Sequence, residues 1–204
     1  MEHPILFSGE MVRAIMEGRK TQTRRVIKLQ PPEGFRPGFS FFTSPGEYEI
    51  RDNSGHFSIG KIPYGTIGDR LWVRETWHKH SDDDDFCTGE IHYRATEICV
   101  GTKWIPSIFM PRWASRITLE VVNVRVERVQ DICFEDCLSE GCDSGFEHYD
   151  GSCNHIEDGS CCQGWHYGSK WNFRYLWDSI NTKRGYGWDV NPWVWVVEFK
   201  RIDA

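Results

Sequence analysis

Short runs in which apolar and polar residues alternate recur along the chain and predict a protein built mainly from β-strands. The runs cover residues 3–7, 70–77, 90–95, 117–129 and 193–202. Residues 117–129 are rich in β-branched side chains and long enough to predict a bent or bulged strand. The almost wholly apolar run Trp193–Val197 predicts a central strand.

Apolar residues at three- and four-residue spacing predict a helix over residues 10–17, with Ser8 as its N-cap. Gly18 then ends the helix in a left-handed conformation. A second short helix follows a cap at Asp131 and stops at Gly141. A third is expected over residues 170–181. Strands with about three short helices predict one α+β domain over residues 1–204, a small β-barrel carrying the helices across its mouth.

Two stretches interrupt this pattern and are interpreted as insertions. Residues 31–63 are punctuated by proline and glycine, which predicts a loop or a hairpin, with strands around 39–42 and 48–50. Residues 142–168 are rich in Gly, Ser, Asp, His and Cys and lack apolar periodicity, which predicts a Cys/Gly-rich loop.

Composition is that of a globular protein, with 39% hydrophobic and 26% charged residues. The ten Trp and twelve Phe pack cores but also stack on flat ligands. A net charge of -6 argues against binding that relies on many phosphate contacts over a long footprint. Charge is uneven, however, because residues 1–30 carry +3 and residues 131–170 carry -8. This asymmetry allows a small anionic or polar ligand at a local basic site.

The chain begins without a signal-peptide pattern and has no apolar run of membrane-spanning length, so we expect a cytoplasmic protein without a membrane partner. No protein partner can be inferred. The eight cysteines are therefore expected to be reduced. Four of them, Cys87, Cys99, Cys133 and Cys137, are interpreted as small buried hydrophobic residues.

The remaining cysteines lie in the second insertion and raise the question of a structural zinc ion. The candidate ligands are Cys142, Cys153, Cys161 and His166. Their spacing contains no Cys-x-x-Cys pair, so ordinary reduced thiols are the alternative interpretation.

A cationic run, Gly18-Arg-Lys-Thr-Gln-Thr-Arg-Arg25, follows the first helix. Cations at a helix C-terminus are favoured by the helix dipole and are commonly solvated, which is the simplest interpretation. Two carboxylates elsewhere require a cation, however. Glu75 shares the apolar face of its strand, and Glu140 lies at a helix C-terminus that disfavours negative charge. We therefore expect the cationic run to meet at least one of them.

These motifs together resemble the ASCH domain, a relative of the PUA-like RNA-binding barrels, as found in proteins of phages and prophages. The resemblance is carried by residues 18–24, Gly68-Asp-Arg-Leu-Trp-Val73, Arg74-Glu-Thr-Trp77, Met110-Pro-Arg-Trp-Ala-Ser-Arg116, the helix at 132–141 and Val196-Val-Glu-Phe-Lys200. It implies a PUA-like barrel that binds RNA or a modified nucleoside. A compact bacterial branch of the family consists of hydrolases. This chain is about twice as long as they are, so its insertions can cover or re-purpose the mouth of the barrel.

That compact bacterial branch is an amidohydrolase that removes the acetyl group from N(4)-acetylcytidine. Matching motif to motif, the resemblance implies Lys20, Thr23 and Glu140 as catalytic residues, with Glu75 as a competing carboxylate. A threonine hydroxyl needs a nearby base, and burial near like charges lowers a lysine pKa enough for that role. The reaction requires no metal and no organic cofactor.

Substrate binding is assigned to cations and one aromatic residue: Arg19, Arg24, Arg25, Trp72 and Arg74. Two alternatives remain open at this point. One is a non-catalytic module that binds RNA or a nucleotide with the same arginines and tryptophans. The other is a ribonuclease that uses the same Lys and Arg cluster.

Overall fold

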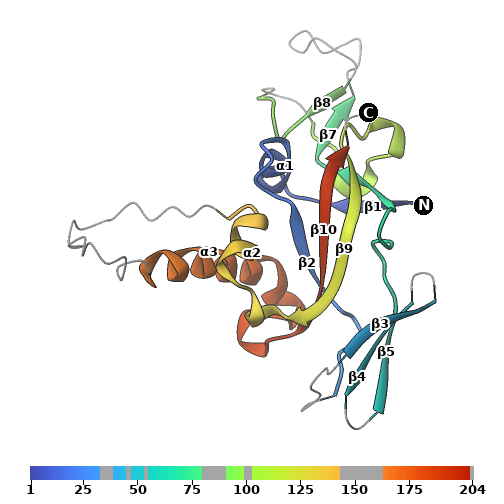
Figure 1. Cartoon of the computed structure of the whole chain (residues 1–204). Helices are drawn as coiled ribbons and strands as arrows, with labels where there is room; N and C mark the ends of the chain where they lie inside the picture. Colours follow the sequence, from blue (N-terminus) through green and yellow to red (C-terminus); the bar gives the residue numbers. More distant parts are fainter. Residues whose placement is uncertain are drawn as a thin grey trace.

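The computed structural model describes residues 1–32, 39–44, 47–52, 55–79, 91–98, 103–142 and 163–202, with the backbone alone for 39–60 and 163–168. It has mixed α and β structure around a five-stranded sheet in the order β1-β6-β9-β10-β2 (Figure 1). The strands are β1 (Glu2–Leu6), β6 (Arg70–Arg74), β9 (Thr118–Arg128), β10 (Trp193–Ile202) and β2 (Gln22–Val26). Strands β1 and β6 are parallel, and the other neighbours are antiparallel.

The central position predicted for the last strand is confirmed, because β10 pairs with both β9 and β2. Its residues Trp193–Val197 are all buried. The predicted irregularity of the long strand is also confirmed. Glu198 faces Asn123 while the next residue, Phe199, faces Val121, which leaves Val122 as the extra residue of a bulge in β9.

The two edges of this sheet approach each other. A guanidinium nitrogen of Arg25, on edge strand β2, donates a 2.6 Å hydrogen bond to the carbonyl oxygen of Leu6, on the opposite edge strand β1. Among the described residues no backbone ladder joins β1 to β2, so the strands form a curled open sheet in which a side chain bridges the edges.

Two smaller sheets extend from this centre. The hairpin expected near residues 39–50 is confirmed, and a third strand is added to it: β3 (Phe39–Ser44), β4 (Glu47–Asp52) and β5 (Gly55–Lys61). The single strand expected over 70–77 is wrong, because β6 ends at Arg74 and β7 (Trp77–Lys79) pairs with β8 (Ile91–Tyr93) in another sheet. The backbone N–H of Glu75 contacts Met110 Sδ in place of a ladder partner, so the chain leaves the central sheet there.

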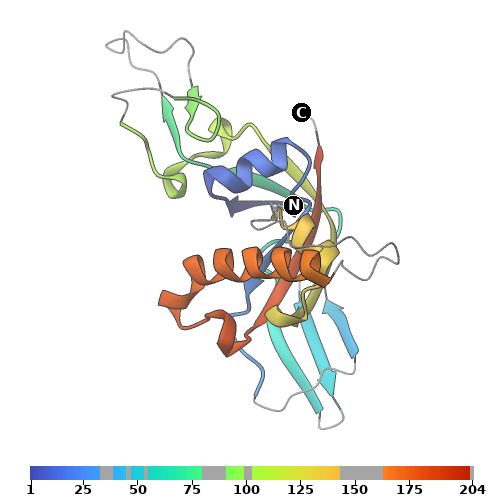
Figure 2. The ribbon, with the colours of Figure 1, turned by 90° about the vertical axis from the view of Figure 1, so that its left-hand side faces the viewer.

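Three α-helices and five 3-10 turns surround the sheets in the described residues. They are α1 (Gly9–Met16), α2 (Phe134–Ser139), α3 (Gln163–Asn181), η1 (Ser107–Phe109), η2 (Arg112–Ala114), η3 (Val129–Asp131), η5 (Thr182–Arg184) and η6 (Trp188–Val190). The Ser8 hydroxyl caps α1, and Gly18 follows it with φ +75°, as predicted. In the view from the β2 side, α3 crosses the sheet and α1 lies above it (Figure 2).

Two helix boundaries differ from the prediction. Helix α2 begins after Cys133, because Asp131 belongs to the preceding turn η3. Helix α3 begins at Gln163 rather than Lys170, so it is longer than expected and includes part of the predicted loop 142–168. Each added helical residue gains a hydrogen bond once a helix is anchored, so a packed C-terminal half can extend backwards through weak helix formers.

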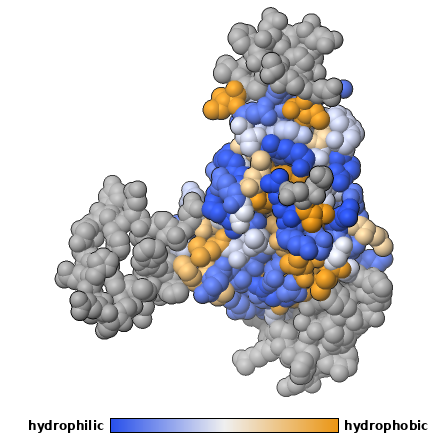
Figure 3. Space-filling model, turned by 45° about the horizontal axis from the view of Figure 1, so that its top comes forward, coloured by the Kyte–Doolittle hydropathy of each residue, from blue (hydrophilic) through white to orange (hydrophobic). Residues whose placement is uncertain are grey.

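The core has two main parts, on opposite faces of β10. On one face, Val12 and Ile15 of α1 pack with Leu71, Leu119 and Trp195. On the other face lie residues from the second and third helices, their flanking turns and β10: Val129, Ile132, Cys137, Phe173, Trp177, Trp188, Val194 and Val196. The outer surface of the described residues is largely hydrophilic on the face shown, with separate apolar patches (Figure 3). None of the described helices has the length and apolar character needed to cross a membrane.

Candidate functional site

Lys20 and Glu140 form a buried ion pair although they are 120 positions apart. The Lys20 ammonium nitrogen, Nζ, lies 2.7 Å from Glu140 Oε2 and 2.8 Å from the Glu140 carbonyl oxygen. Only 2% of Lys20 and 4% of Glu140 is exposed to solvent. The carboxylate at the end of α2 therefore meets the cation that its position required, as predicted.

Gly141 makes this contact sterically possible. Its φ is +83°, and a Cβ placed there would lie 3.0 Å from Ala14 Cβ and 3.2 Å from Lys20 Cβ. Glycine thus both ends α2 and lets the backbones of Lys20 and Glu140 form an isolated antiparallel bridge.

Arg24 extends the pair into a charge network. Its guanidinium contacts three carboxylates: Glu127, Asp136 at 2.6 Å and Glu140 at 3.2 Å. Arg125 joins the same network through Glu127 at 3.2 Å and Asp136 at 2.9 Å. Sequence reasoning missed these partners. The period-two pattern of β9 was the available signal, since it puts Arg125 and Glu127 on one face.

The electrostatics of the network differ from residue to residue. Burial lowers the pKa of Lys20 more than the charge of Glu140 raises it. Burial also acts to lower the pKa of Arg24, but the three carboxylates outweigh it and the pKa is raised. For Asp136 burial acts upward, and Arg24 and Arg125 together bring the pKa below its ordinary value. Lys20 is thus the cation of the network for which burial outweighs the attraction of the carboxylates.

A pocket of about 540 Å³ opens at the β2 edge, between α1, α3 and the facing strand β1. This volume lies within the range of small-molecule sites, ~300–1,000 Å³. Its wall combines cations with aromatic and aliphatic side chains. The residues that contribute to it include Leu6, Met11, Thr23, Arg24, Arg25, Lys28, Tyr64, Arg74, Glu140, Phe173, Leu176, Trp177, Ile180, Arg184 and Tyr186. Of the predicted site residues, Thr23, Arg24, Arg25, Arg74 and Glu140 therefore line one pocket.

The residues of β2 that line the pocket come from both faces of the strand. Thr23 and Arg25 pair with Val197 and Trp195 and share their face, whereas Arg24 shares the opposite face with Val196. No hydrogen bond to the Thr23 hydroxyl is formed within the described part of the chain. Glu140 borders the pocket and contacts Lys20, which itself does not line it. Glu140 is therefore the link between the pocket and the buried amine.

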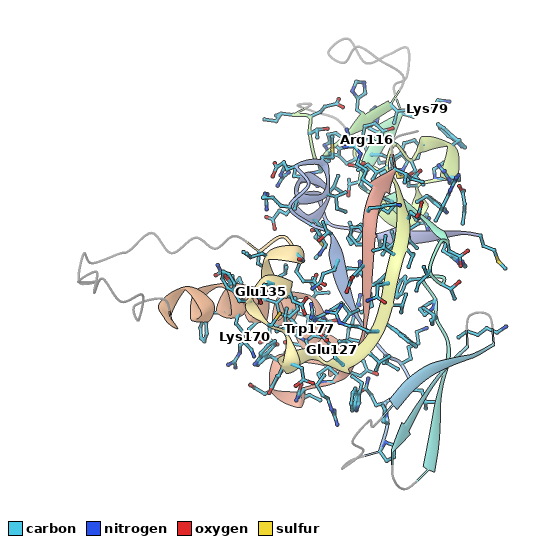
Figure 4. All side chains as sticks on the ribbon, viewed as in Figure 1. Lys79, Arg116, Glu127, Glu135, Lys170 and Trp177 are labelled. Atoms are coloured by element: carbon cyan, nitrogen blue, oxygen red, sulfur yellow. The ribbon has the colours of Figure 1, made fainter. Side chains whose placement is uncertain are left out.

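Glu75 is not brought to this pocket. It is 1% exposed and forms a two-point contact with Arg116, at 2.9 and 3.0 Å, and Arg116 in turn stacks over Tyr93. Figure 4 shows Arg116 at the upper end of the sheet, beside Lys79, and Glu127 and Trp177 at the lower end. Glu75 meets a cation as expected, but this cation is Arg116 and not a member of the cationic run.

Two further predicted binding residues also lie outside the pocket. Trp72 packs against the guanidinium of Arg74 at 5.4 Å and does not line the wall. Arg19 pairs with Glu17 and donates to the Gly141 carbonyl oxygen at 3.2 Å. It borders a second hollow of about 520 Å³, which meets the pocket at Met11, Glu140 and Leu176.

The predicted zinc ligands fall largely outside the described residues. Cys153 and Cys161 are among the undescribed positions, and His166 is described only as backbone within α3. Cys142 is half-buried, and the described residues contain no group of three side chains suited to a metal ion.

Of the cysteines predicted to be small and buried, Cys137 is buried, and burial raises the pKa of its thiol to about 12. Cys133 is exposed, contrary to the prediction, because it precedes the first turn of α2 instead of lying within it. Cys87 and Cys99 lie outside the described residues.

Comparisons of the chain with protein families, with curated proteins and with solved structures find no match.

Proposed function

We propose that the chain is an ASCH-domain protein of the PUA-like class and that the pocket at the β2 edge is the active site of an amidohydrolase. The substrate class is a nucleoside acetylated on its base, with N(4)-acetylcytidine as the candidate. The motifs that carry the resemblance support this proposal, since the run at 18–24 and the helix ending at Gly141 meet in space. The curled sheet with bridged edges is in keeping with a barrel of this class.

One observation carries the chemical part of the proposal. A buried lysine with a lowered pKa is held 2.7 Å from a carboxylate that borders a pocket, and a threonine hydroxyl borders the same pocket. A hydroxyl, a base and a group that connects them are the parts that acyl transfer needs.

In the proposed reaction, the Thr23 oxygen attacks the acetyl carbonyl carbon and its proton passes through the Glu140 carboxylate to the neutral amine of Lys20. The carbon–nitrogen bond then breaks, and the proton moves to the departing amine of cytidine. Water next attacks the acetyl-threonine ester, which releases acetate and restores the hydroxyl. One water is consumed, and cytidine and acetate are formed.

Incubation of the purified protein with N(4)-acetylcytidine tests the proposal. We expect acetate release by the wild-type chain and its loss in Lys20→Ala and Glu140→Ala. Leu176→Ala, which changes the wall without removing a reacting group, is the control and should keep measurable turnover. No acetate release at high protein concentration would overturn the hydrolase proposal.

A second candidate is a non-catalytic module that binds RNA or a nucleotide. It is favoured by the position of Lys20, whose amine is held by both a carboxylate and a carbonyl oxygen of Glu140 and lies behind the pocket wall. Retention of ligand without acetate release, lost on Arg25→Ala, is the result that would select this candidate.

A further inference from the structure

Four of the cations that line the pocket make no direct contact with a carboxylate of the described residues. Lys28, Arg25, Arg74 and Arg184 form no ion pair with any of the described residues. Arg24 is the opposite case, because it faces three carboxylates and its charge is already compensated. Among the described residues of the wall the single acid is Glu140, which is occupied by Lys20 and Arg24. The pocket thus carries an excess of positive charge.

Arg25 has a side-chain donor that the described residues leave unpaired. One of its terminal nitrogens donates to the Leu6 carbonyl oxygen, but its Nε is buried and without a hydrogen-bond partner in the described structure. Burial lowers its pKa, and the charge of the nearby Arg184 acts in the same direction, against Tyr64 and Glu140. A buried donor beside a like charge is unfavourable by itself, and an anion placed between the two guanidinium groups would satisfy the donor and offset the repulsion.

The fold places these cations from separate elements. Arg74 ends β6 beside Leu6, its register partner in β1, and its guanidinium donates to the carbonyl oxygens of Ile108 and Met110. Arg184 ends η5, and Gly185 follows with φ +83°, a turn after which Tyr186 also borders the pocket. Only glycine adopts this conformation without strain, so the turn that aims Arg184 and Tyr186 at one space is specified by sequence.

An aromatic wall accompanies the cations. Tyr64, Phe173, Trp177 and Tyr186 line the same pocket. Aromatic faces stack on nucleobases, whereas arginine forks bind phosphate oxygens in pairs. The two kinds of group together match a ligand that has a flat ring and an anionic end.

We propose that this pocket takes its nucleoside in phosphorylated form, with the phosphate held by Arg25 and Arg184 and the base against the aromatic wall. The inference rests on the proposed function for the identity of the base, but the phosphate requirement concerns binding and not acetyl removal. The ligand class is therefore a nucleoside phosphate, either a free nucleotide or a nucleotide unit of RNA.

Equilibrium titration tests this subsite, with cytidine, cytidine 5′-monophosphate and a short cytidine-containing RNA as probes. We expect the monophosphate to bind about tenfold or more tightly than cytidine at low salt, since charge-assisted hydrogen bonds are stronger than neutral ones. The Arg184→Gln variant should lose most of this difference and keep its affinity for cytidine. Lys183→Gln is the matched control, because Lys183 is the neighbouring cation of η5 and does not line the pocket.

Equal affinities for cytidine and its monophosphate, or no binding of either, would overturn the phosphate subsite. RNA binding stronger than monophosphate binding, with the same loss in Arg184→Gln, would support it and identify RNA as the source of the phosphate. Failure of the hydrolase proposal alone would give a different result. The protein would still bind the monophosphate more tightly than cytidine but would release no acetate from an acetylated ligand.

Discussion

Burial determines the direction in which the pKa of Lys20 is shifted. Its pKa is lowered from the ordinary lysine value of about 10.4, so the neutral amine that accepts a proton exists at a lower pH than in an exposed lysine. Acetate release at saturating substrate should therefore rise with pH and level off below about pH 10.4. Lys20→Arg, which remains protonated, should abolish the rise. A rate independent of pH across this range would contradict a basic role for Lys20.

Arg24 is the residue on which the charge network depends most. Removing it leaves Glu127, Asp136 and Glu140 close together with fewer cations, and breaking a buried pair costs ~3–5 kcal/mol. Arg24→Ala should lower the free energy of unfolding by about this amount in urea titrations. Arg112→Ala, which removes an exposed pair with Glu2, should cost less than ~1 kcal/mol. Similar losses in the two variants would show that the network is not stabilising.

At the scale of elements, the joint between α1, β2 and α2 holds the site together. Gly141→Ala would place a Cβ at φ +83° against Ala14 and Lys20, so it adds steric overlap to the strain of a left-handed residue. We expect a loss of more than ~1–2 kcal/mol in stability and a fall in acetate release. Gly68→Ala is the matched control, since its φ is +86° but open space surrounds it. It should lose stability from strain alone and keep its activity.

Sequence reasoning was most successful where one residue decides a local structure. Gly18 and Gly141 are helix stops with positive φ, and the apolar run at 193–197 is a central strand. It failed where the outcome depends on distant partners. The chain leaves the sheet at Glu75 because of Met110, and α3 starts early because its later residues are packed on the core. Alternation and composition carry no information on such contacts.

At the scale of the whole molecule, the two candidate carboxylates have separate partners. Glu140 borders the pocket, whereas Glu75 does not line it and is paired with Arg116. Glu75→Gln should therefore lower stability by about 2 kcal/mol or more while leaving the rate of acetate release of the folded protein unchanged. Glu140→Gln should abolish the rate. Loss of activity in well-folded Glu75→Gln would place the reaction at the pair of Glu75 and Arg116 instead.

The candidate site was only partly predictable for the same reason. The sequence predicted that the cationic run meets a carboxylate that requires a cation, and the structure forms this contact between Lys20 and Glu140. The choice between Glu75 and Glu140 did not follow, because each has its own arginine and the sequence does not pair them. The aromatic and cationic wall from α3 and η5 was missed, since its residues belong to an ordinary amphipathic helix and a surface turn.

The proposed reaction begins with attack of the Thr23 hydroxyl on the acetyl group in this pocket. Acetate release by Thr23→Val tests it most directly, because this substitution removes the hydroxyl and nearly preserves the shape. Thr21→Val is the control from the same run, where Thr21 is exposed and Thr23 is buried at the pocket. The account predicts a loss of at least ~10²-fold in Thr23→Val and an unchanged rate in Thr21→Val. Wild-type acetate release from Thr23→Val would contradict it.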